Sequence, residues 1–197
     1  MNIRSAELRD INRIVEIHCS AFDGFFLTSL GSDFLRLYYR SYLNFSQALL
    51  LCAEDNDEVV GFSATAKLVN GFNTQLIKRN LCGFLWMGVK LLFTNPMSLI
   101  RLYKNMTKGG ESTDSGGYAE LYSIGVHETA QRKGIGAMLL SETEKRLAEE
   151  HIQRVSLTTD ARENEATQAF YRTMGYELLY EFKTYPQRQM LRLMKKL

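Results

Sequence analysis

A polar segment with two glycines has the composition of an anion-binding turn. It reads Gln131-Arg132-Lys133-Gly134-Ile135-Gly136-Ala137 and follows an apolar run that ends at Val126. Glycine adopts positive φ and lets a ligand approach the backbone closely. The first amides of a helix have no partner within it and carry roughly half a unit of positive charge. We therefore expect the backbone N–H groups of residues 131–137 to bind a pyrophosphate, with Arg132 and Lys133 adding positive charge.

The spacing of the glycines distinguishes three kinds of phosphate site. A dinucleotide fingerprint has its first glycine directly after the strand and a third glycine where this chain has Leu139. A P-loop needs Gly-Lys followed by Ser or Thr, and the sequence contains no Gly-Lys pair. The interpretation that remains is a site for coenzyme A.

Hydrophobic periodicity predicts the elements that position this turn. Strand patterns alternate with helical patterns in the second half of the chain, and the last helix ends at Gly175, a residue typical of the position after a helix. The elements expected there are strands over Tyr118–Val126, Gln153–Thr159, Tyr176–Lys183 and Gln187–Met194, and helices over Gly134–Glu150 and Asn164–Met174.

The first half of the chain predicts a strand, two helices and a hairpin. A break over Leu27–Gly31 separates the helices, and Ser32 or Asp33 is expected to cap the second. The turn Asp55-Asn56-Asp57 joins the hairpin strands. The strands expected are Ile3–Ala6, Ala48–Glu54 and Glu58–Leu68, and the first helix begins at Asp10. The whole order predicts one α/β domain over residues 1–197 with a mixed (α+β) sheet, not a doubly wound one.

Residues 70–117 interrupt this order between the third and fourth strands. Asn70–Met106 has apolar residues at helical spacing, and Pro96 is expected to separate two helices. Lys108–Gly117 is rich in glycine and polar residues, so we expect a mobile loop. The run Phe84-Leu85-Trp86-Met87 fits a lid on an acceptor pocket, a homodimer surface or a contact with a membrane interface. Packing within the chain or in a dimer is the favoured interpretation.

Composition restricts the class of protein. The 197 residues are 45% hydrophobic and 23% charged, close to globular averages. The net charge of +2 gives no argument for nucleic acid or for an anionic membrane surface. The longest apolar run, Leu81–Phe93, is shorter than the roughly 20 residues that a transmembrane helix needs.

The cysteines and histidines indicate a compartment and exclude a kind of site. The three cysteines have no CxxC spacing, and the N-terminus has no apolar export signal, so a soluble cytoplasmic protein is expected. Cysteines and histidines also lack the spacing of metal ligands, and we therefore expect no metal.

Two blocks of the sequence resemble the GNAT N-acetyltransferases. Gln131–Gly136 fits their Gln/Arg-x-x-Gly-x-Gly/Ala motif. Asn164–Tyr176 fits their second motif, a helix that begins with Asn and ends with Phe-Tyr-x-x-x-Gly-Tyr/Phe. The resemblance implies an acyl-CoA N-acyltransferase fold with a helical insertion between the third and fourth strands. Similarity is strong over Tyr118–Tyr176, weaker over Met1–Phe22 and Leu49–Leu68, and absent over Asn70–Gly117.

The resemblance implies that acetyl-CoA binds as a co-substrate between two splayed parallel strands. The pantetheine arm would pair with the backbone of Ile124 and Val126, as an added strand would. A bulge near Tyr122-Ser123 would open the splay. Asn164 would contact the cofactor, or it would simply cap its helix.

The resemblance also implies a reaction, the direct attack of an amine on the thioester in a ternary complex. A protonated amine needs a base, and Glu120 occupies the place of the general-base glutamate of the histone acetyltransferase branch, with a water as the alternative. Tyr171 matches the tyrosine whose hydroxyl points at the sulfur, where it would act as the general acid.

Three functions follow from these expectations. The first is transfer of an acetyl group to a primary amine of a small molecule, such as an amino sugar or an amino acid derivative. The second has a protein N-terminus or a lysine as the acceptor. The third is a non-catalytic acyl-CoA-binding sensor. Acceptor selectivity is expected in residues 70–117 and in Phe22–Leu30.

Overall fold

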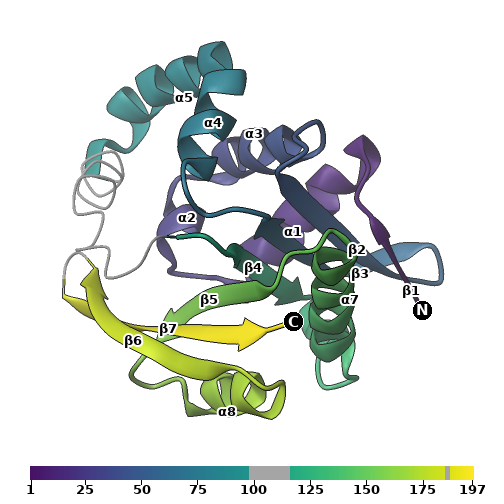
Figure 1. Ribbon diagram of the computed structural model, residues 1–197. Coiled ribbons are helices and arrows are strands. Elements are labelled where there is room, and N and C mark those ends of the chain that lie inside the picture. Colours follow the sequence, from purple (N-terminus) through teal and green to yellow (C-terminus); the bar gives the residue numbers. More distant parts are fainter. Residues whose placement is uncertain (98–115, 185–186) are drawn as a thin grey trace.

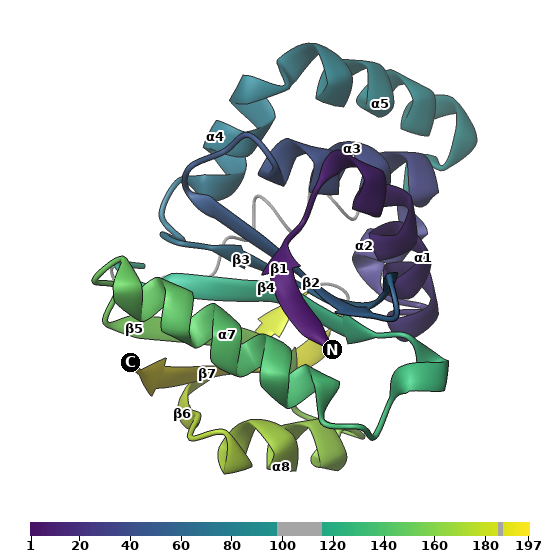
Figure 2. The same ribbon diagram turned by 90° about the vertical axis from the view of Figure 1, so that its right-hand side faces the viewer.

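The computed structural model describes residues 1–97, 116–184 and 187–197, and its described part is a mixed sheet with helices on both faces (Figures 1 and 2). The strand order is β1-β2-β3-β4-β5-β7-β6, and among the described strands only β4 and β5 pair in parallel. The strands are β1 (Asn2–Ser5), β2 (Ala48–Asp55), β3 (Glu58–Ala66), β4 (Ala119–Val126), β5 (Arg154–Asp160), β6 (Glu177–Thr184) and β7 (Arg188–Lys196).

The helices form three layers around the sheet. Figure 2 shows α1 and α3 on one face, α7 and α8 on the other, and α5 outside α3. The α-helices are α1 (Ile11–Ala21), α2 (Phe26–Ser29), α3 (Ser32–Tyr42), α4 (Phe72–Arg79), α5 (Leu81–Thr94), α7 (Ile135–Glu149) and α8 (Glu165–Thr173), and the 3-10 turns are η1 (Leu8–Asp10) and η2 (Glu128–Ala130). Among the described helices, none combines the length and the apolar character that crossing a membrane requires.

The side chains of β2 divide between two cores, one on each face of the sheet. Leu49 and Leu51 pack with α7, whereas Leu50 and Cys52 pack with α1 and α3. Such alternation follows from the two-residue period of a strand. A strand with apolar residues at successive positions therefore becomes a central strand that is covered on both faces.

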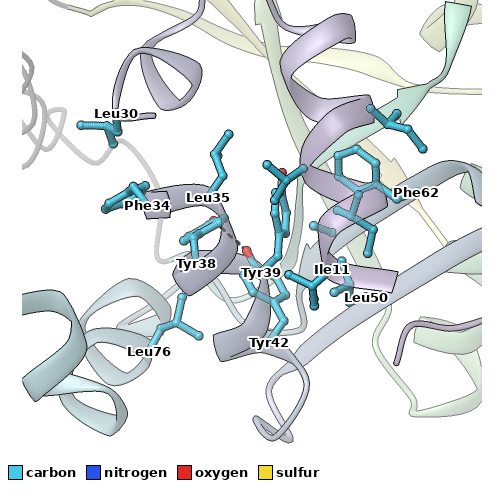
Figure 3. Packing of buried hydrophobic residues seen from close by; sticks show 14 of the residues in the cluster. Ile11, Leu30, Phe34, Leu35, Tyr38, Tyr39, Tyr42, Leu50, Phe62 and Leu76 are labelled. Atoms are coloured by element: carbon cyan, nitrogen blue, oxygen red, sulfur yellow. Dashed lines mark hydrogen bonds between the residues drawn. The ribbon is translucent and has the colours of Figure 1, made fainter. Parts of the chain in front are cut away.

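The core between the sheet and α3 is aromatic. Tyr38, Tyr39 and Tyr42 of α3 lie between Phe62 of β3 and Leu76 of α4 (Figure 3). Their hydroxyls stay paired in this apolar layer, since those of Tyr38 and Tyr42 lie 2.7 Å apart. Buried phenols need such partners, because an unpaired buried hydroxyl costs free energy.

The hairpin and the order of the elements confirm the predictions. Asn56 and Asp57 adopt φ values of 49° and 63°, which a tight turn between β2 and β3 requires. Two details of the first half were wrong. The predicted break over Leu27–Gly31 contains the short helix α2, and the residue before α3 is Gly31, not Ser32 or Asp33. Gly31 has a φ of 88°, which favours glycine there.

Two helices, α4 and α5, lie between β3 and β4. They meet at Asn80, where the backbone leaves the helical region (φ −124°, ψ 34°). This break was not predicted from the sequence. Pro96 follows the end of α5 at Thr94. The second helix expected after Pro96 and most of the loop expected over Lys108–Gly117 lie outside the described residues. That α4 and α5 are an addition to a family fold stays a prediction.

Candidate active site

The parallel strands β4 and β5 diverge beyond their first residues. They pair only from Ala119–Leu121 with Val155–Leu157. The register of β4 against β3 shifts at the same place, because Ser123 lies opposite Ala64 while Leu121 lies opposite Thr65. Tyr122 is therefore the extra residue of a bulge, as predicted, and a bulge bends its strand away from a neighbour.

The backbone groups of Ile124 and Val126 face the divergence. The amide of His127 donates to the carbonyl of Val60 on β3 at 2.8 Å. Because backbone groups of successive residues point to opposite sides of a strand, those of residues 124 and 126 point away from β3. The side-chain amide nitrogen of Gln131 donates to the Val126 carbonyl at 3.2 Å, so this carbonyl points away from β3, as expected. Beyond Leu121, no described strand pairs with this edge of β4, and the edge can pair with an extended ligand.

A cavity of about 710 Å³ occupies the divergence. Its wall is formed by β4, the following turn, β5, α8 and the end of α1. Its lining includes every residue that was predicted to bind the cofactor except Lys133, and it also includes the predicted general acid. These residues are Ile124, Val126, Gln131, Arg132, Gly134, Ile135, Gly136, Ala137, Asn164 and Tyr171.

The glycines leave space at the beginning of α7. Gly134 adopts a φ of 77° as the residue before the helix, and a Cβ atom there would meet nothing within 4 Å. A Cβ atom at Gly136 would meet only the ring of Phe170, at 3.9 Å. The amides of Ile135, Gly136 and Ala137 belong to the first turn, so no earlier helical carbonyl can accept from them. The turn therefore has both the open space and the donors that an anion needs.

Asn164 links the end of β5 to the beginning of α8. It occupies the residue before the helix, but its side chain caps no amide of α8 and instead donates to the hydroxyl of Thr159 at 2.6 Å. Asn164 also lines the cavity, and its side-chain amide oxygen can accept a hydrogen bond. Contact between Asn164 and the cofactor stays a prediction. The alternative, that the side chain only caps α8, does not agree with the hydrogen bonds.

Tyr171 is the buried phenol of the cavity wall. Its side chain is 8% exposed and its ring lies 5.2 Å from that of Phe170 and 5.8 Å from that of Tyr176. Burial raises the pKa of Tyr171 to about 12. The hydroxyl is therefore protonated at neutral pH and able to donate a proton or a hydrogen bond.

Glu120 does not line this cavity. It precedes Leu121, whose side chain packs in the core beneath α7, so alternation directs Glu120 to the opposite face of the sheet. There its carboxylate lies 3.3 Å from a guanidinium nitrogen of Arg192, which also donates to Ser156 at 3.1 Å. Glu120 is 5% exposed. The structure thus brings Tyr171 and the turn together and places Glu120 elsewhere, beside a buried cation.

A second cavity, of about 750 Å³, adjoins the first at Phe25, Asp160 and Asn164. Nε and one Nη nitrogen of Arg188 donate to the two carboxylate oxygens of Asp160. The guanidinium lies 4.6 Å from the centroid of the Phe25 ring. Asp160 and Arg188 carry no motif in the sequence, and the register of β5 with β7 brings them together. Phe25 belongs to the predicted selectivity segment Phe22–Leu30. The other residues of this wall are Arg162, Glu163, Lys183, Gln187 and Gln189.

Known structures share this fold at low sequence identity. The ribosomal-protein-alanine N-acetyltransferase of Brucella melitensis is 18% identical, with a TM-score of 0.65 and 100% of each chain covered. The ribosomal-protein-S18-alanine N-acetyltransferase of Escherichia coli is 14% identical, with a TM-score of 0.64 and coverage of 99% of this chain and 92% of that one. The yncA protein of Salmonella typhimurium, crystallised with its cofactor acetyl-CoA, is 16% identical, with a TM-score of 0.62 and coverage of 100% and 94%.

The sequence itself was compared with protein families and with curated proteins. No curated protein matches the chain. The family model described as "Acetyltransferase (GNAT) family" matches residues 11–176, which include β4, the glycine turn and α8. This span is most of the chain, and the protein therefore belongs to the GNAT family of acetyltransferases.

Proposed function

We propose that this protein transfers an acetyl group from acetyl-CoA to a primary amine of a small molecule, by direct attack in a ternary complex. The observation that carries the proposal is the 710 Å³ cavity, in which the open edge of β4, the glycine turn and the protonated Tyr171 meet. The acetyl-CoA in the yncA structure, named as its cofactor, is consistent with this choice of donor.

The residues present fit coenzyme A. A pyrophosphate needs several N–H donors and space beside the backbone, and the beginning of α7 supplies both at Gly134 and Gly136. The amide and carbonyl groups of a pantetheine arm need an unpaired strand edge, which Ile124 and Val126 present. The Gln131 side chain already bonds the Val126 carbonyl. A carbonyl oxygen accepts two hydrogen bonds, so a ligand can share it.

Tyr171 supplies the proton that the leaving group needs. In the proposed step the amine nitrogen bonds to the acetyl carbon while the carbon–sulfur bond breaks. The departing thiolate takes the hydroxyl proton of Tyr171, which solvent later returns. Acetyl-CoA supplies the activated acyl group, and the wall of the cavity orients it. No acyl-enzyme is required, so the chain needs no activated nucleophile of its own.

A water is the favoured acceptor of the amine proton. Glu120 was the predicted base, but its carboxylate is buried on the other face of the sheet and paired with Arg192. A general base must lie within hydrogen-bond reach of the proton that it removes, and the ion pair holds this carboxylate away from the cavity. A water in the open cavity meets neither obstacle.

The second cavity is the proposed position of the acceptor. It lies beside the first, and its volume is in the range of roughly 300–1,000 Å³ that small-molecule sites occupy. Its wall carries both signs of charge and amide side chains, which suits a polar amine such as an amino sugar or an amino acid derivative. A protein N-terminus or a lysine is the alternative acceptor.

The experiment that tests the proposal measures thiol release from acetyl-CoA over a panel of amines. The panel contains amino sugars, amino acid derivatives and peptides with free N-termini or lysines. Turnover with small amines and not with peptides supports the proposal, and turnover with peptides alone supports the protein acceptor. Tight binding of acetyl-CoA by calorimetry without turnover on any amine would identify a sensor module instead.

A further inference from the structure

The small net charge of the chain conceals an uneven distribution. Residues 59–110 contain seven Lys or Arg residues and no Asp or Glu, whereas the rest of the chain has 17 basic and 22 acidic residues. The segment is therefore +7 and the remainder −5 (24 − 7 = 17; 17 − 22 = −5). Charge asymmetry of this kind indicates a partner of opposite sign. The described part of this segment includes α4 and α5.

Helix α5 is apolar on the side that the described residues leave uncovered. Met87 and Leu91 are buried, and the ring of Phe84 lies 6.1 Å from that of Phe34 on α3. The opposite side is exposed, and Figure 2 shows α5 at the other end of the molecule from α8. Its exposed residues are Leu81 (49%), Leu85 (61%), Trp86 (71%), Val89 (47%), Leu92 (58%) and Phe93 (86%).

This outer face is contiguous. Leu81, Leu85, Val89 and Leu92 follow one another at steps of four, four and three residues, which places them on one stripe of a helix. Trp86 and Phe93 are seven residues apart and widen the stripe. Single exposed apolar residues are ordinary, but a contiguous patch marks a contact with another molecule or with a membrane.

The cations near α5 decide between lipid and a second copy of the chain. Lys78 and Arg79 are exposed on α4, just before α5, and Lys90 lies within α5. Lys90 pairs with Asp33 of α3, and Arg79 donates to the backbone carbonyl of Asn44 at 2.9 Å. One carboxylate therefore balances one of these three positive charges. A symmetric dimer would place the same patch against itself and bring like charges together. An anionic surface meets the cations and the apolar stripe at once.

We propose that the outer face of α5 docks on an anionic lipid surface. The helix has 14 residues, about 21 Å at 1.5 Å per residue, so it would lie in the interface rather than cross it. The exposed aromatic and aliphatic side chains enter the headgroup boundary, and the positive charge of α4 and α5 attracts the anionic headgroups. This inference is independent of the acetyl-transfer proposal, because it concerns another surface.

Trp86 makes the proposal directly measurable, since it is the only tryptophan of the chain. We expect its fluorescence to shift to shorter wavelength, and brominated lipids to quench it, when the full chain meets vesicles of phosphatidylcholine mixed with phosphatidylglycerol. Vesicles of phosphatidylcholine alone should bind the protein more weakly. Added salt should also weaken binding, because it screens the attraction to the headgroups. An unchanged Trp86 spectrum with anionic vesicles would overturn the proposal.

Two variants separate docking from a general loss of solubility or folding. Phe93→Glu replaces the most exposed residue of the face, so it should leave the fold intact and lower vesicle partition by about tenfold or more, through lost apolar contact and added repulsion. Leu178→Glu on β6 is the matched control, because Leu178 is 55% exposed and lies at the other end of the molecule. It should bind vesicles as the parent does. A dimer in sedimentation that Phe93→Glu dissociates, with no vesicle binding by the parent, would assign the face to self-association and refute lipid docking.

Discussion

At the level of single residues, Tyr171 is the side chain on which the chemistry of the proposal depends. Removing its hydroxyl in Tyr171→Phe should lower kcat by about 10²- to 10⁴-fold, the usual contribution of a general acid. The ring stays in place, so the affinity for acetyl-CoA, measured by calorimetry, should not change. Because the pKa of Tyr171 is raised to about 12, the parent should show no loss of rate from its ionisation up to about pH 10. A variant with full kcat would remove Tyr171 from the mechanism.

Glu120 is the residue whose predicted and observed surroundings differ most. Glu120→Gln removes the charge that Arg192 faces and leaves a buried cation without its partner. We expect the free energy of unfolding in urea to fall by about 3 kcal/mol, while kcat changes by less than about tenfold. Glu120→Asp, which keeps the charge, is the control for the loss of stability. A drop in kcat of about 100-fold or more, together with loss of the acidic limb of the pH–rate profile, would instead identify Glu120 as the base.

The motif residues could be predicted because each has a property that few other residue types share. Glycine at residue 134 is required by a positive φ, and Tyr171 follows a recognisable pattern, so both could be predicted from sequence. Thr159, Asp160 and Arg188 could not. They are ordinary polar residues, and only the strand register and the turn before α8 bring them to the same place.

Among the elements, the beginning of α7 is the part that binding depends on. Gly136→Val fills the space beside the proposed pyrophosphate, whereas Gly134→Val would also strain a φ of 77°. We expect Gly136→Val to weaken acetyl-CoA binding by at least about tenfold in calorimetry and to leave the urea midpoint nearly unchanged. Gly88→Val in α5, where a Cβ atom meets nothing within 4 Å, is the matched control and should bind normally. Normal affinity in Gly136→Val would remove the turn from the site.

The elements that the sequence failed to predict are those with weak or misleading periodicity. Helix α2 has four residues, which is too short for a helical repeat to appear. The apolar repeat continues from α4 into α5 without a change of phase at Asn80. An asparagine alone is only a weak indication that a helix ends. The splay of β4 and β5 was predictable only through the family resemblance. A bulge at Tyr122 is the result of pairing with β3, which a single strand does not encode.

For the molecule as a whole, His18 should make stability depend on pH in a window that the other described groups with shifted pKa values do not share. Its side chain is 2% exposed, Nδ1 lies 2.6 Å from the Tyr39 hydroxyl, and burial lowers its pKa to about 4 from a usual 6.5. The folded protein therefore keeps His18 neutral where the unfolded chain takes up a proton. Stability is present above about pH 6.5 and falls as pH drops toward 4, by up to about 3 kcal/mol at 1.36 kcal/mol per pH unit. The Asp10 carboxyl, with a pKa lowered below 3.8, acts only at lower pH. Urea unfolding of the parent and of His18→Asn between pH 7 and pH 4 tests this, and an equal slope in both proteins would show that His18 titrates freely in the folded state.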